Sequence, residues 1–216
     1  DGKHPAADYV DGCGTLYPDP ININVAATVS GDEMTIDFTG THSEVMAPIN
    51  IPYPALLASV IYCMKALINP DLPTNWGILR PLTIIAPKGS IVNPEEPCAV
   101  GLTIDANQRV PDAIFGALNG VLSKRALAAS NGACTPCVFF GQVSNNGRDQ
   151  YFICHEAIAG GAGASHIHDG LSGVQDYLTN TSNMPIEATE GEFPAIMVKK
   201  YLLRTDSGGA GEFRGG

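Results

Sequence analysis

The chain has 216 residues, of which 44% are hydrophobic, enough to bury a sizeable core in one large domain or two small ones. Its 22 acidic residues outnumber its 12 basic ones, and the formal charge of −10 argues against a surface that follows the phosphates of DNA or RNA. No stretch approaches the roughly 18 apolar residues of a membrane helix, and the first residues do not resemble a signal peptide. We therefore expect a cytoplasmic protein that binds neither nucleic acid nor membrane.

Two strands and a helix are predicted in the first third of the chain. Residues 21–29 and 34–40 alternate apolar and polar side chains on either side of a glycine–aspartate turn, which indicates a β-hairpin. Apolar residues then recur at helical spacing through 52–68. Pro70 and Pro73 follow them, so the helix is expected to end there.

The rest of the chain mixes short β segments with one more helix. Four prolines confine strand pairing in 80–97 to short or edge segments, and a helix is expected over 111–129. Further strands are predicted at 137–143, 150–158 and 194–204. Because the β and α segments do not alternate regularly, we expect an α+β fold with mixed sheets and a few packed helices.

The six cysteines are widely spaced except for the pair in Cys134-Thr-Pro-Cys137, and three of them lie in apolar sequence. This distribution favours buried free thiols in a reducing compartment over a disulfide scaffold. The Cys-x-x-Cys pair precedes a predicted strand and not a helix, and no second pair completes a zinc site. We interpret it as two partly buried thiols, with a redox pair as the alternative.

Three common catalytic motifs are absent from the sequence. There is no phosphate loop of the form Gly-x-x-x-x-Gly-Lys-Ser/Thr, so a nucleotide, if one is used, is not expected to be held by this chain alone. The Gly-x-Ser-x-Gly elbow and the His-Glu-x-x-His motif are also missing. Their absence removes most of the support for a serine hydrolase or a zinc peptidase.

A carboxylate stands where an apolar strand runs into a glycine loop. Glu156 follows QYFICH and precedes AIAGGAGASHIHDG, where glycine lets the backbone approach a ligand closely. Glu156 is therefore a candidate general base or ligand-orienting group, although a glutamate bonded to the loop backbone fits the same pattern. His166, His168 and Asp169 supply ligand types that suit a divalent transition metal, and an exposed polar loop is the alternative.

Four stretches resemble the hydantoinase B/oxoprolinase family, which also contains the large subunits of ATP-dependent ketone carboxylases. They are NPDLPTNWGILRPLTIIAPKGSIVNP, GGAGASHIHDG, TNTSNMPIEATEGEFP and YLLRTDSGGAGEFRGG. The resemblance runs from about Asp8 to Gly216, and its final Arg-x-Asp-Ser-Gly-Gly-Ala-Gly motif is specific. Members of the family are typically much longer, so residues 1–216 are expected to be a partial domain of a larger multidomain subunit.

The resemblance implies a division of labour between two subunits. A partner of the hydantoinase A type would bind ATP and phosphorylate the substrate carbonyl oxygen, and the B-type subunit would complete hydrolysis. Because phosphorylation activates the amide, the second site needs only a positioned water, a base and donors for developing charge. The chain is accordingly expected to be part of an ATP-dependent hydrolase that opens a hydantoin, 5-oxoproline or a related lactam within a hetero-oligomer.

Two alternatives stay open at this point. In one, the chain belongs to an acetone- or acetophenone-type carboxylase that acts on a ketone; in the other, it is a non-catalytic piece that only assembles a larger complex. The family also implies a divalent metal, which would be manganese, zinc or magnesium. The family segments that look like the metal-binding part, Asn-Asp-Pro-Tyr and Gly-Thr-His, lie upstream of this sequence, so the metal ligands are expected outside this chain.

The resemblance also implies which residues form the site. Glu156 and Asp169, in the family's glycine loop, are the catalytic candidates. Arg109 matches only in part, because many relatives carry Glu-Thr-Ser-Gln-Arg where this chain has Asp-Ala-Asn-Gln-Arg. Relatives commonly place an arginine where Ser165 stands, so the neighbouring His-x-His pair is a feature of this chain. The substrate-binding candidates are Gly160, Gly161, Gly163, Asn180, Asn183 and Arg109.

Overall fold

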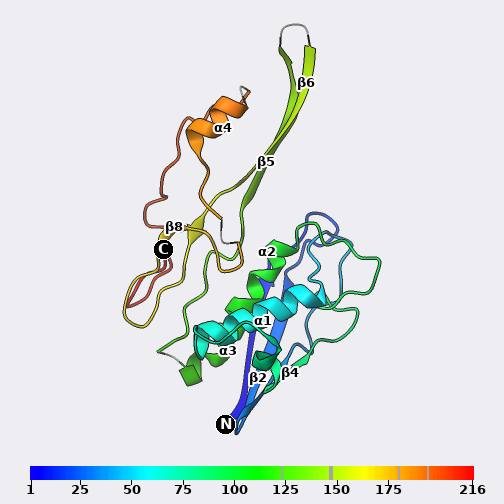
Figure 1. Cartoon of the computed structure of the whole chain (residues 1–216), viewed down its shortest axis with the longest axis vertical. Coiled ribbons are helices and arrows are strands. Elements are labelled where there is room, and N and C mark those ends of the chain that lie inside the picture. The colour runs from blue at the N-terminus through cyan, green and yellow to red at the C-terminus, as the bar shows by residue number, and fades with distance from the viewer. Residues whose placement is uncertain (123, 146–147, 180, 194) are drawn as a thin grey trace.

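The computed structural model describes residues 1–122, 124–145, 148–179, 181–193 and 195–216, and it shows two parts joined by extended segments (Figure 1). The first part contains a four-stranded sheet with helices packed on it. The second contains a long β-hairpin, a short helix and an extended C-terminal segment.

The sheet of the first part is built from β1 (Gly2–Val10), β2 (Ile21–Ser30), β3 (Glu33–Asp37) and β4 (Leu82–Ile85), in that order across the sheet. The first three strands are antiparallel neighbours, and β4 runs parallel to β3. Over most of its length β2 alternates between buried and less buried residues. One face of the sheet therefore lies against the core.

Helices α1 (Tyr53–Leu67) and α3 (Arg109–Leu122) cover this face of the sheet (Figure 1). α3 contacts β1 and β2 directly, and α1 packs against α3. The short helices η1 (Trp76–Leu79) and α2 (Thr103–Asn107) lie in the connections. No helix in the described part of the chain combines the length and apolar character needed to cross a bilayer. The core consists mainly of large apolar side chains, among them Ile36, Phe38, Leu56, Met64, Ile114 and Leu118.

The second part is dominated by an antiparallel hairpin of β5 (Pro136–Asn145) and β6 (Arg148–Ala157), which projects away from the first part (Figure 1). Helix α4 (Ile186–Glu192) lies beside this hairpin. A small two-stranded sheet of β7 (Gly160–Gly161) and β8 (Ser172–Val174) follows the hairpin along the chain.

The predicted α+β architecture is confirmed, as are the hairpin over 21–40 and the helix over 52–68. The strands predicted at 137–143 and 150–158 are the two arms of the β5–β6 hairpin. The sequence patterns do not predict β1, α2 or α4, because none of these segments carries a clear apolar periodicity.

The boundaries predicted for the second long helix are wrong. The helix expected over 111–129 spans Arg109–Leu122. Pro111 falls within its first turn, where the missing N–H costs no hydrogen bond. Further along, the Ala128 N–H donates to the Ala164 carbonyl of the glycine loop at 2.9 Å, a bond that a helix continuing to residue 129 would have to give up.

The strand predicted over 194–204 is also wrong, because its described residues, 195–204, are irregular. A strand needs a neighbouring strand to complete its hydrogen bonds. Here the Val198 N–H instead donates to the Glu190 side chain of α4, at 2.6 Å. Residue 194 lies outside the described residues.

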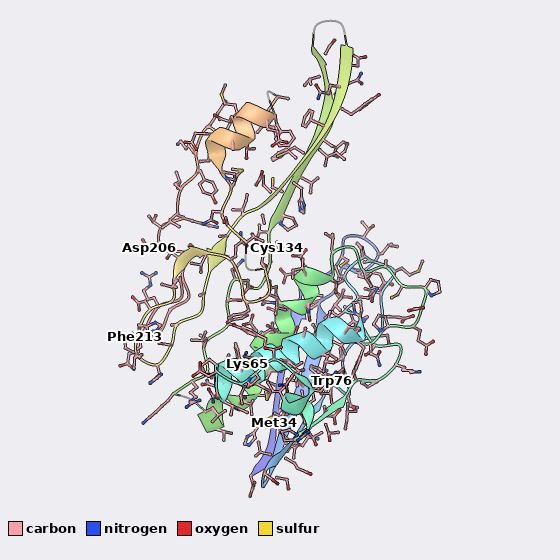
Figure 2. All side chains as sticks on the ribbon, in the orientation of Figure 1. Met34, Lys65, Trp76, Cys134, Asp206 and Phe213 are labelled. Carbon is pink, nitrogen blue, oxygen red and sulfur yellow. The ribbon has the colours of Figure 1, made fainter. Side chains whose placement is uncertain are left out.

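All six cysteines are free, as predicted. Cys134 is buried and Cys137 half-buried, which confirms the interpretation of this pair as partly buried thiols. Cys134 lies where the first part meets the base of the hairpin (Figure 2). Its N–H donates to the Asp105 carboxylate of α2 at 3.3 Å, so the backbone of the pair helps to join the two parts.

Candidate functional site

Arg109 is the centre of a buried ion network between β1 and α3. Its guanidinium lies 2.9 Å from a carboxylate oxygen of Asp112, one turn along the helix, and 3.3 Å from one of Asp8 on β1. The Arg109 side chain is 13% exposed and that of Asp112 only 1%. The arginine predicted to bind substrate therefore already has two carboxylate partners inside the chain, and it ties the sheet to its covering helix.

Burial raises the pKa of both carboxyl groups in this network. Desolvation raises the pKa of Asp112 above its usual range, and the Arg109 charge opposes that rise. The pKa of Asp8 is raised for the same reason, again against the effect of Arg109. Ser130 also supports Asp112, because its N–H and hydroxyl lie 3.2 and 3.3 Å from the two carboxylate oxygens.

The connection after α3 links this ion network to the glycine loop. Gly132 has a φ of +68°, and a Cβ at this position would overlap the Arg109 guanidinium. Beside it, the Asn131 N–H donates to the Gly161 carbonyl at 3.0 Å, and a Cβ on Gly160 would overlap the Asn131 side chain. The structure thus brings three of the predicted site residues, Arg109, Gly160 and Gly161, into one neighbourhood.

The loop glycines pack closely against other backbone segments. A Cβ on Gly161 would overlap the Gly216 backbone, and one on Gly163 would overlap the Ala128 carbonyl. The Gly216 N–H donates to the Ala162 carbonyl at 3.0 Å. A cavity of about 290 Å³ remains between these segments, lined mainly by small residues. Close packing alone accounts for glycine at these positions, and their part in ligand binding stays a prediction.

Asp169 ties the glycine loop to the C-terminal segment. Its Oδ1 accepts the Arg214 N–H at 2.7 Å, and the adjacent Gly170 N–H donates to the Arg214 carbonyl at 2.7 Å. Figure 2 labels Asp206 and Phe213 on this segment, and the Asp206 carboxylate forms an exposed ion pair with the Arg214 side chain at 3.3 Å. The side chain of Asp169, a predicted catalytic residue, therefore also holds the C-terminal segment in place.

His166 and His168 are exposed at the tip of the loop. The His168 and Ile167 N–H groups donate to the Ser165 hydroxyl at 3.1 and 3.2 Å, which makes a local turn. Among the described residues, no group of three or more histidine, cysteine or acidic side chains is placed to hold a metal ion. The metal implied by the resemblance, whose ligands are expected outside this chain, stays a prediction.

Glu156 lies in a different pocket, on one face of the hairpin. In the β5–β6 register Cys137 pairs with Glu156 and Phe139 with Cys154, which puts these four side chains on the same face of the hairpin. The cavity in front of them has a volume of about 570 Å³. Thr189, Lys199 and Lys200 complete its polar lining, and its apolar wall is formed by Phe139, Ile158, Met184, Ile196, Met197 and Val198.

Two donors hold one oxygen of Glu156. The Thr189 hydroxyl donates to Oε1 at 3.2 Å, and the Cys154 thiol lies 3.9 Å from the same atom. Desolvation, and secondarily the Glu156 charge, raises the pKa of Cys154, so this thiol keeps its proton and can donate it. Both bonds engage Oε1, and among the described residues no bond to Oε2 is found.

Helix α4 is held over the hairpin by a small number of contacts. The rings of Phe152 on β6 and Phe193 lie 6.1 Å apart between centroids. The Ile196 N–H donates to the Phe193 carbonyl at 2.8 Å, and the Val198 N–H donates to Glu190 at 2.6 Å. These bonds keep the segment that follows α4 in place as one wall of the Glu156 pocket.

The two predicted asparagines have different outcomes. The Asn183 side chain donates to the Gly173 carbonyl at 2.8 Å and so supports β8. Asn180 lies outside the described residues. Glu156 and Gly161 line different cavities, so the predicted site divides between the hairpin pocket and the glycine loop.

Comparison with known proteins decides which family this chain comes from. The family model described as Hydantoinase B/oxoprolinase matches residues 1–216. The chain belongs to this family. Over 90% of its length it is 38% identical to 5-oxoprolinase 1 of Arabidopsis thaliana, and over 100% it is 31% identical to a putative B-type subunit of a D-/L-hydantoinase from a Pseudomonas species.

A solved member supports the fold of this hydantoinase B/oxoprolinase chain. The crystal structure of ATP-dependent caprolactamase from Pseudomonas jessenii matches it with a TM-score of 0.84 and 26% identity over 100% of the chain. The chain spans 14% of the Arabidopsis protein, 37% of the Pseudomonas hydantoinase subunit and 38% of the caprolactamase chain. It therefore corresponds to a part of each of these larger family members.

Sequence reasoning missed three residues that shape the two sites of this hydantoinase B/oxoprolinase chain. Cys154 precedes Glu156 by two positions on a predicted strand, and that spacing alone could have placed it on the same face. Thr189 and Asn131 carry no local signal, because they reach Glu156 and Gly160 only through the fold.

Proposed function

We propose that this chain is part of the B-type subunit of an ATP-dependent amidohydrolase that opens a cyclic amide. Membership of the hydantoinase B/oxoprolinase family supports this proposal, as does the likeness to a structure described as an ATP-dependent caprolactamase. The observation that carries it is Glu156, a carboxylate held through one oxygen by Thr189 in an otherwise mainly apolar pocket.

In the proposed reaction Glu156 is the general base. A partner subunit of the hydantoinase A type activates the amide by phosphorylating its carbonyl oxygen, and the chemistry of this chain begins with that activated amide. Glu156 takes a proton from water as the water oxygen bonds to the activated carbon. The carbon–nitrogen bond of the ring then breaks, the proton passes to the leaving nitrogen, and a second water releases phosphate from the acyl phosphate.

The hydrogen bonds around Glu156 suit this role. Thr189 and Cys154 hold Oε1 and so fix the orientation of the carboxylate, which leaves Oε2 to meet water. Asp169 and the loop glycines are assigned a positioning role, because their bonds fix the glycine loop and the C-terminal segment relative to each other. Arg109 acts in the same indirect way, by supporting Gly132 and its neighbours.

The test is an assay of the full-length protein with its ATP-binding partner subunit. We expect ATP-dependent release of ADP and of a ring-opened amino acid from a cyclic amide, in the absence of bicarbonate. Glu156→Gln should lower kcat by about 10²–10⁴-fold, as expected for the loss of a general base. Glu192→Gln, which changes an exposed glutamate at the end of α4, is the matched control and should retain activity.

Three results would overturn this assignment in different ways. Strict dependence on bicarbonate and a ketone would identify a carboxylase. An unchanged kcat for Glu156→Gln would remove Glu156 from the chemistry. If the complex assembles through this chain but no variant of its pocket alters turnover, the chain is an assembly scaffold.

A further inference from the structure

We infer that the Glu156 pocket holds the ring of an uncharged, methylene-rich lactam, with the reacting carbon toward Glu156 and the ring methylenes against the apolar wall. This inference rests on the proposed function, and it selects among the cyclic amides that the function leaves open. Hydantoins and 5-oxoproline would be poorer substrates than lactams whose rings carry only methylene groups.

The composition of the wall is the first reason. Around the single carboxylate, the lining that comes from the hairpin, Met184 and the segment after α4 is built mainly from aliphatic, thioether and aromatic side chains. Methylene groups gain free energy when they leave water for such a surface. A hydantoin ring replaces methylenes by a second N–H and a second carbonyl, and both would lose their water hydrogen bonds against an apolar wall.

The placement of charge is the second reason. The cations that line the pocket, Lys199 and Lys200, are exposed, as are Phe139 and Met197 of the apolar wall, whereas Glu156 is half-buried. A ring carboxylate, as in 5-oxoproline, could pair with these lysines only at the solvent side of the pocket. Seated beside Glu156 it would meet a like charge and an apolar wall, and both raise its free energy.

A natural thiol in the pocket provides a binding measurement that does not depend on turnover. Cys137 lines the pocket and is half-buried, whereas the half-buried Cys13 and Cys98 lie outside it. The complex of the full-length protein with its partner is treated with N-ethylmaleimide without ATP, and the labelling rate of each cysteine is followed by mass spectrometry. ε-Caprolactam and δ-valerolactam should slow the labelling of Cys137 several-fold and leave Cys13 and Cys98 unchanged.

The same measurement with other rings decides the substrate class. Hydantoin and 5-oxoproline at equal concentration should protect Cys137 much less. Protection by 5-oxoproline that equals or exceeds that of caprolactam, and that disappears in the Lys199→Ala, Lys200→Ala double variant, would show that the lysines select a carboxylate and would overturn the inference. Absence of protection by any lactam would overturn it as well.

A change in the wall tests the same point through turnover. Met184→Gln keeps the length of the side chain but places an amide in the wall, so kcat/KM for caprolactam should fall about tenfold relative to that for hydantoin. Met46→Gln, at a methionine that is 87% exposed in the first part of the chain, is the control. Equal losses for all rings in Met184→Gln would contradict the inference.

The two proposals fail separately. If lactams are hydrolysed but do not protect Cys137, the proposed hydrolase activity is supported and the ring must bind outside the Glu156 pocket. If lactams protect Cys137 but the complex does not hydrolyse them, lactam binding in the pocket is supported and the proposed reaction is rejected.

Discussion

Arg109 and Asp112, one turn apart on α3, form an ion pair of 2.9 Å beneath the surface, and Gly132 lies directly against the guanidinium. Because Asp8 of β1 shares the same cation, one side chain connects a strand, a helix and the segment that leads to the glycine loop. The stability of this junction can therefore be tested with single substitutions, all made in the full-length protein.

Removing the positive charge of Arg109 should lower the stability of the fold. In Arg109→Met, Asp8 and Asp112 are left buried without their partner, and we expect the free energy of unfolding to fall by about 3–5 kcal/mol. Denaturant unfolding measures this loss. Arg214→Met, which breaks an exposed pair with Asp206, should cost only about 0–1 kcal/mol through that pair. Equal losses in the two variants would contradict the buried network.

The raised pKa of Asp112 gives stability a definite pH dependence. Its folded pKa lies above the unfolded value of about 3.9, so the native state holds this proton more tightly. The stability that results is fully present below the unfolded pKa and is lost as the pH rises through the folded pKa. Asp112→Asn cannot ionise, and its unfolding midpoint should rise relative to that of the wild type as the pH increases through this window. A difference that stays constant with pH would rule out the raised pKa.

Gly132 and Gly31 provide a matched pair for measuring the close approach to Arg109. Both have a positive φ, +68° and +61°, but only Gly132 has a side chain in the space that a Cβ would fill. Alanine at either position incurs about 1–2 kcal/mol of backbone strain. Gly132→Ala should cost about 1–3 kcal/mol more than Gly31→Ala, because the arginine must move. Denaturant unfolding of the two variants gives the comparison, and equal costs would show that Arg109 moves aside freely.

The bond between Asp169 and Arg214 should be visible in amide exchange. Asp169→Ala removes the acceptor of the Arg214 N–H, and the loss of about 1 kcal/mol of local stability should speed hydrogen exchange at Arg214 about fivefold. Asp169→Asn keeps an acceptor oxygen and should change the rate much less. Exchange measured by NMR, with Gly170 as a second reporter, distinguishes this role from a purely chemical one.

The parts of the fold that were predictable are those in which local sequence and burial agree. The apolar residues of the hairpin over 21–40 alternate with the period of a strand, so they share one face of the sheet. Helix α1 carries an apolar stripe that is buried in the core. The helix α4 has no such stripe: its sequence, IEATEGE, contains one strongly apolar residue and a glycine. Its position depends on contacts outside the helix, such as the Phe152–Phe193 pair.

The sequence predicted which types of residue form the candidate site, but it did not predict which of them contact one another. The strand-to-glycine transition pointed to Glu156, and the structure places this side chain in the lining of a cavity, while its role as a general base stays a prediction. The partner of Glu156, Thr189, lies 33 positions away along the chain, and no pattern in either segment indicates the other. In the same way, the close approach of Asn131 to Gly160 depends on how the chain leaves α3.

The crowding at Gly161, Gly170 and Gly216 bears on what the glycines of the loop and of the C-terminal segment indicate. Each of these glycines has backbone atoms where a methyl group would stand, so together they mark a place where the glycine loop and the C-terminal segment cross at minimum separation. Close packing of backbone therefore accounts for these glycines, whereas the proposed choice of substrate rests on the side chains around Glu156.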